Sequence, residues 1–145
     1  MSDLATSFVT ALPFVRHVGI GADGDGTLVL AQEPHHGNHV GTLHAGALFT
    51  LGESASGAAI VRDLAPALGG ALPVAKDASI AYRKPARGRI VARGALAEGV
   101  DAIAARVAKD GKASFEVAVT MTDEAGVEVA TMRVTWYVRA PAKEG

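Results

Sequence analysis

Residues 42–62 read TLHAGALFTLGESASGAAIVR, and this stretch decides the fold. Between Leu43 and Val61 the only formal charge is Glu53. The stretch is long enough for about five helical turns at roughly 3.6 residues per turn, and a helix that is apolar on nearly every side lies in the middle of a fold. A carboxylate is costly there unless it is paired, hydrogen-bonded or protonated. Glu53 therefore needs a structural or a catalytic explanation.

The bulk composition is that of an ordinary globular chain, with 145 residues, 49% hydrophobic and 20% charged. The length suits a single domain over residues 1–145, with a helix in residues 1–13 and a flexible tail at 140–145. The formal net charge of -1 gives no general attraction to nucleic acid or to an anionic membrane. The absence of cysteine excludes disulfides and thiolate chemistry. Without a signal peptide or a convincing bilayer span, the sequence predicts a cytoplasmic protein.

The N-terminal part predicts a helix followed by a hairpin. Residues 3–12 suit a short amphipathic helix that is capped by Asp3 and ends before Pro13. Its expected apolar face consists of Leu4, Phe8, Val9 and Leu12. A brief apolar segment at 17–21, a turn at 23–26 and a strand at 27–32 then suit a hairpin.

The C-terminal half predicts an antiparallel sheet. Five segments suit strands, namely Leu72–Lys84, Arg89–Leu96, Ala102–Lys109, Ser114–Thr122 and Val127–Arg139. The segment from Ser114 alternates apolar and polar residues with period two, and Asp110-Gly111 indicates a tight hairpin turn. The predicted fold class is α+β, with a sheet wrapped around the long central helix.

Three polar residues near the central helix are candidates for chemistry: Asn38, His44 and Glu53. The helix start has unpaired N–H groups and a positive dipole end, and at Ala45 and Gly46 a substrate oxygen could approach them closely. His44 and Glu53 are nine residues apart, which is about 13 Å along a helix. A homodimer with antiparallel central helices would bring Glu53 of one copy to the helix start of the other. The alternative is that Glu53 and His44 are structural.

Four histidines lie within ten residues, at positions 35, 36, 39 and 44. Histidine is a common metal ligand. However, Glu33 is the only acidic residue close to them, and the spacing matches no helical zinc motif. We expect no metal site.

The motif Asn38-(5 residues)-His44-Ala45-Gly46-Ala47-Leu48-Phe49-(3 residues)-Glu53 resembles the signature of the hotdog-fold acyl-CoA thioesterases, the PaaI-like group. That pattern has an Asn, a His-Gly-Gly six residues later, and an acid nine residues after the His. The segment 77–86, DASIAYRKPA, also resembles the strand that follows the helix in this family. The resemblance covers residues 14–139.

The resemblance implies a role for each matched residue. Glu53 would be the catalytic carboxylate, acting on water or attacking directly, and the Ala45 N–H would polarise the thioester carbonyl. His44 would shape the helix start, and Asn38 would orient water or the thioester. The chain departs from the family at Ala45, where Gly is usual, and at position 75, where an alanine replaces a hydroxyl residue.

Further positions are implied as substrate contacts. Gly46 lies beside the carbonyl site, and Lys76 is placed to pair with Glu53. Four positive charges fall within seven residues around Pro85, of which Arg83, Lys84 and Arg87 could hold the phosphates of coenzyme A; charge protection of a strand edge is the other reading.

The implied activity is hydrolysis of an acyl-CoA or a related acyl thioester by a homodimer or homotetramer with composite sites. No cofactor is expected apart from coenzyme A as part of the substrate. A non-catalytic acyl-CoA-binding hotdog protein is the main alternative, because hotdog domains also serve as binders. A dehydratase is disfavoured because no histidine follows position 44.

Overall fold

The computed structural model describes residues 4–24 and 26–141 and contains four α-helices and six strands in these ranges. The helices are α1 (Leu4–Thr10), α2 (Pro13–Val18), α3 (Ala45–Asp63) and α4 (Val100–Asp110), with short 3-10 turns at Pro34–His36 and Ala65–Ala67. The strands are β1 (Gly21–Ala22), β2 (Leu28–Ala31), β3 (Val74–Tyr82), β4 (Arg89–Leu96), β5 (Lys112–Thr122) and β6 (Glu128–Arg139).

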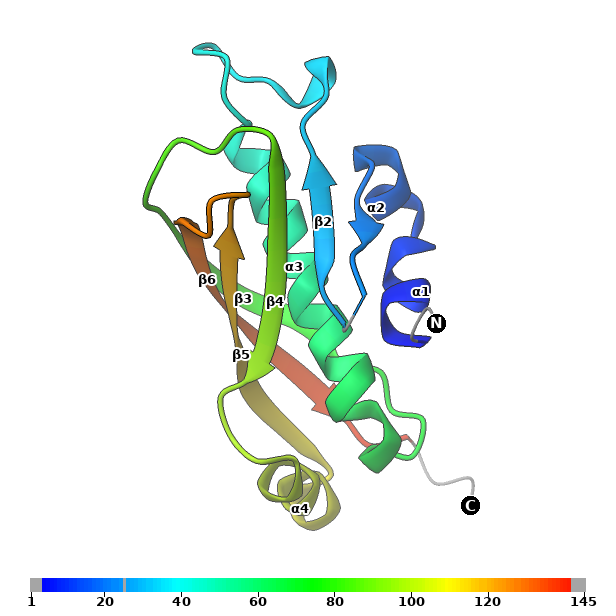
Figure 1. Cartoon of the computed structure of the whole chain (residues 1–145). Helices are drawn as coiled ribbons and strands as arrows, with labels where there is room; N and C mark the ends of the chain where they lie inside the picture. The colour runs from blue at the N-terminus through cyan, green and yellow to red at the C-terminus, as the bar shows by residue number, and fades with distance from the viewer. Residues whose placement is uncertain (1–3, 25, 142–145) are drawn as a thin grey trace.

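The six strands form one antiparallel sheet in the order β1-β2-β4-β5-β6-β3. Strands β4, β5 and β6 follow one another as a meander, whereas β3 crosses to the far edge and pairs only with β6. Figure 1 shows α3 running through the middle of the molecule with the sheet around it and α1 and α2 on its other side. The predicted α+β class with a sheet wrapped around a long helix is confirmed.

The central helix can lie close to the sheet because small residues cover its inner face. Its buried residues include Gly52, Ser54, Ala55, Ala58 and Ala59, and α3 contacts β2, β4, β5 and β6. A close approach of this kind brings the many weak dispersion contacts of a packed core into range. The central helix was predicted because the stretch carries so little charge, and the structure confirms its position.

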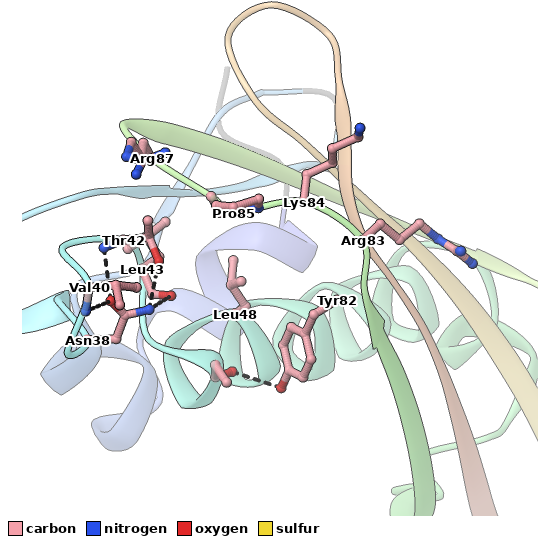
Figure 2. Close-up of a pocket in the computed structure, with 12 residues that line it drawn as sticks. Asn38, Val40, Thr42, Leu43, Leu48, Tyr82, Arg83, Lys84, Pro85 and Arg87 are labelled. Atoms are coloured by element: carbon pink, nitrogen blue, oxygen red, sulfur yellow. Dashed lines mark hydrogen bonds between the residues drawn. The ribbon is translucent and has the colours of Figure 1, made fainter.

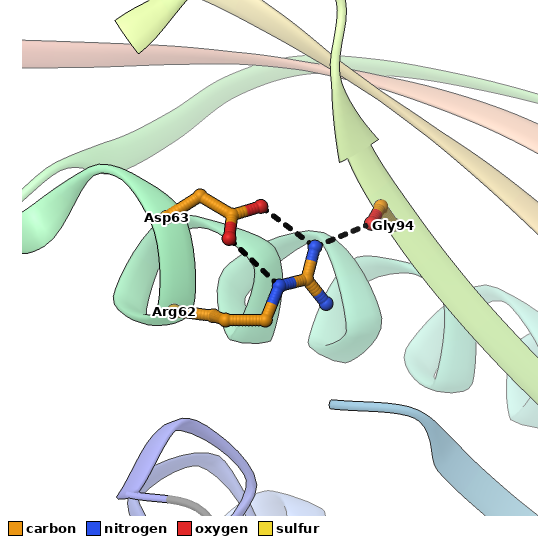
Figure 3. A network of polar contacts seen from close by, with 3 residues as sticks. All are labelled: Arg62, Asp63 and Gly94. Atoms are coloured by element: carbon orange, nitrogen blue, oxygen red, sulfur yellow. Dashed lines mark hydrogen bonds and ion pairs between the residues drawn. The ribbon is translucent and has the colours of Figure 1, made fainter. Parts of the chain in front are cut away.

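An arginine at the end of α3 ties the helix to the sheet. Arg62 donates through Nε and Nη2 to both carboxylate oxygens of Asp63, at 2.9 and 2.7 Å, and Nη2 also donates to Gly94 O at 3.1 Å (Figure 3). Hydrogen bonding from Arg62 to the carboxylate lowers the pKa of Asp63, and burial of the carboxylate has a smaller, opposite effect. The group fixes the C-terminal turn of α3 against β4.

Two sequence predictions for the second half are wrong. Residues 102–109 belong to α4, whose buried residues Ile103 and Val107 are four positions apart, the spacing of one helical face. Asp110-Gly111 is not a hairpin turn, because Gly111 has a φ of 74° and caps the C-terminus of α4. Strand β5 starts directly afterwards. The predicted strand Arg89–Leu96 is present with the same ends, and the remaining predicted strands are present with shifted ends.

The N-terminal prediction is right in outline and wrong in detail. A helix and a hairpin are present, but Pro13 starts a second helix that the sequence reading did not foresee. On α1 the buried residues are Ala5, Thr6 and Val9, whereas Leu4 is 87% exposed. The predicted cap Asp3 and residues 142–145 of the predicted tail lie outside the described residues. None of the described helices combines the length and the apolarity needed to cross a bilayer.

Candidate active site

The loop before α3 is organised by one amide side chain. Asn38 Nδ2 donates to Thr42 Oγ1 at 2.7 Å and to Leu43 O at 3.3 Å, and Asn38 Oδ1 accepts from the backbone N–H groups of Val40 and Thr42. An amide has two donors and two acceptor sites, so the loop uses all of them. Leu43 N also donates to Ala86 O at 2.9 Å. We therefore assign Asn38 to shaping the loop.

A buried histidine fixes the other end of this loop. His36 Nδ1 accepts from Glu33 N at 3.0 Å, and His36 Nε2 lies 2.6 Å from Val18 O. These two contacts require a neutral ring that carries its proton on Nε2. His36 O in turn accepts from His44 N at 2.8 Å. His36 thus joins α2 and the loop through its ring, and the start of α3 through its backbone carbonyl.

The first turn of α3 leaves one backbone N–H group open. His44 is the N-cap, and its Nδ1 accepts from Gly46 N at 2.8 Å. Ala47 N donates to His44 O at 3.0 Å. Ala45 N–H donates no hydrogen bond to any of the described residues. The sequence predicted several free N–H groups at this helix start, and the structure leaves the N–H of Ala45, at the positive end of the helix dipole.

Gly46 has a local reason to be glycine. A Cβ at this position would lie 3.1 Å from His44 Nδ1 and 3.4 Å from His44 Cε1. The missing side chain therefore lets the imidazole ring lie over the helix start and accept the Gly46 N–H. Gly46 acts on the cap geometry, and its own N–H is not available to a ligand while this hydrogen bond is made.

A pocket of about 360 Å³ lies over this helix start (Figure 2). Its lining brings together five of the predicted site residues: Asn38, Ala45, Arg83, Lys84 and Arg87. Tyr82 lies across the first turn of α3, and its hydroxyl donates to Ala45 O at 3.1 Å. The pocket therefore joins an open N–H group to a basic loop.

The three basic residues of the pocket differ in their surroundings. Arg83 Nε donates to Thr131 Oγ1 at 3.1 Å and lies 3.5 Å from a carboxylate oxygen of Glu128. Within the described part of the chain, Lys84 and Arg87 form no ion pair. In Figure 2, Arg83 and Arg87 extend to opposite sides. Lys84 and Arg87 are thus the cations that an incoming anion could contact without displacing a carboxylate.

Glu53 lies in a different place on the same helix. Its side chain is half-buried and lines an apolar cavity of about 420 Å³ between α3, α1 and the end of the sheet. Burial raises the pKa of Glu53 above its ordinary value of 4.5. Eight residues separate Ala45 from Glu53, which is about 12 Å along the helix axis. Within one chain, the Glu53 carboxylate and the open Ala45 N–H group are therefore far apart.

Lys76 lies away from both places. Its Nζ donates at 2.9 Å to Ser114 Oγ on β5, which is two strands away from the edge strand β3 that carries Lys76. A pocket beside it contains Arg106, Lys112 and Tyr137. The predicted pairing of Lys76 with Glu53 is not made within the described chain.

Several residues next to the site were missed from sequence. Trp136 Nε1 donates to Ser56 Oγ at 3.1 Å, and Ser56 Oγ donates to Glu53 O at 2.6 Å, so the indole is tied to the turn that carries Glu53. Tyr82 was seen only as part of a strand motif. Helix spacing could have placed Ser56 near Glu53, but the contact with Trp136 joins residues 80 positions apart.

The loop histidines do not form a metal site. Among residues 4–24 and 26–141, no group of three or more His, Cys, Asp or Glu side chains is arranged to hold a metal ion. His36 is engaged with backbone groups on both ring nitrogens, and His35 lies 3.5 Å from Glu33. This cluster belongs to the architecture of the loop.

Comparisons with known proteins show what the chain is similar to. Residues 1–138 match the family described as "Domain of unknown function (DUF4442)". A Pseudomonas aeruginosa protein of unknown function, described as a probable thioesterase, is 28% identical, with 95% of each chain covered and a TM-score of 0.83. No curated protein matches the chain.

Two further solved structures contain ligands. A Bacillus halodurans protein with CoA is 21% identical over 88% of this chain and 78% of that chain, with a TM-score of 0.67. A Streptococcus mutans protein bound to acetyl CoA is 22% identical over 86% of this chain and 90% of that one, with a TM-score of 0.60. At this level of identity the two show the fold.

The chain belongs to the DUF4442 family. Its long central helix and six-stranded antiparallel sheet are those of the hotdog fold, as in the thioesterase superfamily. The predicted fold and superfamily are confirmed, and the PaaI-like subgroup stays a prediction.

Proposed function

We propose that the protein is an acyl-CoA thioesterase whose active site is completed by two copies of the chain. The observation that carries the proposal is the open Ala45 N–H at the start of α3, in a pocket lined by Lys84 and Arg87. An N–H at a helix start stabilises the negative charge that develops on a carbonyl oxygen. The neighbouring cations suit the phosphates of coenzyme A.

The second half of the chemistry comes from Glu53. A half-buried carboxylate is a better base than an exposed one, because its raised pKa lies nearer to neutral pH. As water attacks the thioester carbon, Glu53 takes a proton from it and the carbonyl oxygen becomes an oxyanion bonded to the Ala45 N–H. The C–S bond then breaks, and Glu53 returns the proton to the coenzyme A thiolate. The products are a carboxylic acid and free coenzyme A.

Composite sites follow from the distance within one chain. Glu53 and Ala45 are about 12 Å apart along α3, so a thioester carbonyl cannot contact both in one copy. Strand β3 pairs with β6 on one side only, which leaves its outer edge for another strand. A second copy paired along β3 about a two-fold axis would run its α3 antiparallel to the first. We propose that Glu53 of each copy works with Ala45 of the other.

The first test is hydrolysis of acyl-CoAs of graded chain length, followed by release of free thiol. Glu53→Gln keeps the size of the side chain and removes the base, and we expect a loss of about 10²–10⁴-fold in kcat. Ala45→Pro replaces the N–H by a ring carbon and leaves the helix intact, because proline suits the first position of a helix. His44, with ψ of 140°, is already extended as a residue before proline must be. We expect a loss of about 10²–10³-fold, while Ala45→Ser keeps the N–H and most of the activity.

Mixing the two inactive variants tests the composite site. A heterodimer of Glu53→Gln and Ala45→Pro contains one intact site and one doubly damaged site. After unfolding and refolding an equal mixture, half of the dimers are mixed, so we expect about one quarter of the wild-type activity. No recovery, with dimers present in sedimentation, would place both groups of a site in the same copy.

The main alternative, a binding protein without chemistry, has its own outcome in these assays. Wild type would then bind acyl-CoA and release no thiol, and Glu53→Gln would bind equally well. No cofactor is needed for the proposed reaction, in which coenzyme A is part of the substrate. The cytoplasmic location stays a prediction from sequence.

A further inference from the structure

The cavity beside Glu53 is apolar almost throughout. It measures about 420 Å³, and its lining includes residues of α1 and α3 and the indole of Trp136. Of the side chains that line it, only Glu53 and Ser54 bring polar atoms that are not already used, since the Trp136 N–H is bonded to Ser56. A cavity of this size lies within the range of small-molecule sites, roughly 300–1,000 Å³.

The two polar groups lie on neighbouring positions of α3, and both lack partners among residues 4–24 and 26–141. Ser54 is 3% exposed, and within the described chain its Oγ has no hydrogen-bond partner. A buried hydroxyl without a partner is costly and is usually satisfied by water or a ligand. Glu53 forms no ion pair among the described residues. The polar end of the cavity is therefore at Glu53 and Ser54, and the remainder suits a hydrocarbon.

Gly57 stands one helical turn after Glu53, on the same face of α3. Glycine is among the least favourable residues for a helix interior. Its backbone does not require it here, and an added Cβ would lie 3.9 Å from the Trp136 ring, an ordinary contact distance. The missing side chain leaves free volume between α3 and Trp136 and thereby extends the cavity.

The outer wall of the cavity comes from α1 and from the turn between α1 and α2. Phe8 and Leu12 line it and are nevertheless 54% and 41% exposed. Val9, between them, is buried against the core. Helix α1 is thus held by Val9 while two large apolar side chains remain at the mouth, where a hydrocarbon would cover them.

We propose that this cavity binds the acyl chain of the thioester, in the copy that supplies Glu53, and that Gly57 sets the chain length accepted. The proposal rests on the proposed thioesterase function, which places the thioester carbon at Glu53. A methylene is similar in size to a water molecule, whose share of liquid is about 30 Å³, so 420 Å³ holds at most about 14 such groups. The occupant that fits this volume is an acyl chain of medium length, about eight to twelve carbons.

Binding of S-alkyl-coenzyme A thioethers tests the inference without any chemistry, because these compounds have no carbonyl to hydrolyse. Calorimetric titration of the wild-type protein with alkyl chains of increasing length should show affinity rising by up to about fourfold per methylene. The rise should stop at about ten to twelve carbons, when the cavity is full. An affinity that does not depend on chain length would overturn the proposal.

Substitution of Gly57 locates the bound chain. Gly57→Val adds three carbons to the cavity, and we expect the limit to move to chains shorter by about two or three methylenes. Gly57→Ala should move it by about one and is the safer variant for folding, because alanine favours the helix. The control is Gly99→Val, at an extended N-cap of α4 where an added Cβ meets nothing within 4 Å. An unchanged limit in both Gly57 variants would refute the role of Gly57.

The two proposals fail in different ways. If the thioethers bind with the expected limit and no acyl-CoA is hydrolysed, the cavity proposal stands and the thioesterase proposal fails. If acyl-CoAs are hydrolysed and the Gly57 variants keep the wild-type length profile, the thioesterase proposal stands and the cavity proposal fails.

Discussion

Gly94 is the point where β4 comes closest to α3, and its replacement by alanine tests the packing that positions the candidate site. An added Cβ would lie 2.8 Å from Ala55 O and 3.2 Å from Ala59 Cβ. Carbon atoms pack best at about 3.5–4.0 Å, and the nearest atom belongs to the helix backbone, which cannot rotate away. Helix α3 and strand β4 must therefore separate.

We expect Gly94→Ala to lower the free energy of unfolding by about 1–3 kcal/mol, the usual cost of overfilling a packed core. For a chain of this size the melting temperature should fall by roughly 2–4 °C for each kcal/mol. Gly57→Ala is the matched control on the same helix. Its Cβ meets only ordinary contacts, so we expect a gain of about 0.5–1 kcal/mol from helix propensity.

Urea unfolding followed by circular dichroism and by the fluorescence of the single tryptophan measures both variants. The midpoint should shift while the slope m stays unchanged, because the surface exposed on unfolding is the same. A Gly94→Ala variant as stable as wild type would show that α3 and β4 do not pack this closely. Equal destabilisation by both substitutions would show that the effect is not specific to the contact.

Three further predictions concern the site. Burial raises the pKa of Glu53 above 4.5, so the folded state binds this proton more tightly than the unfolded state does. The free energy of unfolding should therefore fall as pH rises from about 4.5 through the raised pKa, while kcat rises over the same interval. Glu53→Gln should abolish both trends, which urea titrations and pH–rate profiles measure. His44→Ala should cost about 0.5–2 kcal/mol through loss of the helix cap, whereas His44→Asn should cost much less in the same unfolding assay. Trp136→Phe should cost about 1–3 kcal/mol by removing the hydrogen bond to Ser56, and a double-mutant cycle with Ser56→Ala should show coupling; additive losses would contradict the contact.

The sequence was sufficient for the central helix and most of the sheet because their patterns are unambiguous. The run from Leu43 to Val61, in which Glu53 is the one formal charge, suits only a buried helix. The alternation that begins at Ser114 suits only a half-buried strand. Residues 102–109 were misread because alanines flank both Ile103 and Val107, so that the apolar spacing fits either period. The glycine at 111 then supported a hairpin, although glycine also ends helices.

The site was predictable only in part, for a physical reason. The motif places Asn38, His44 and Ala45 within one loop and one turn, where local geometry fixes their relation. The cavity at Glu53 instead depends on α1 and Trp136, which are distant in sequence and are brought there by tertiary packing. A composite site also depends on a second chain, which no spacing within one sequence can position.

The loop before α3 has a consequence for the thermodynamics of binding. Its backbone is tied to α2 through His36, to the turn at Ala86 through Leu43, and to itself through Asn38. Fixing a free backbone costs about 1–2 kcal/mol per residue in conformational entropy, and here that cost is met during folding. A ligand that docks at the helix start therefore meets a surface that is already ordered, and its association should not be slowed by a folding step of the loop.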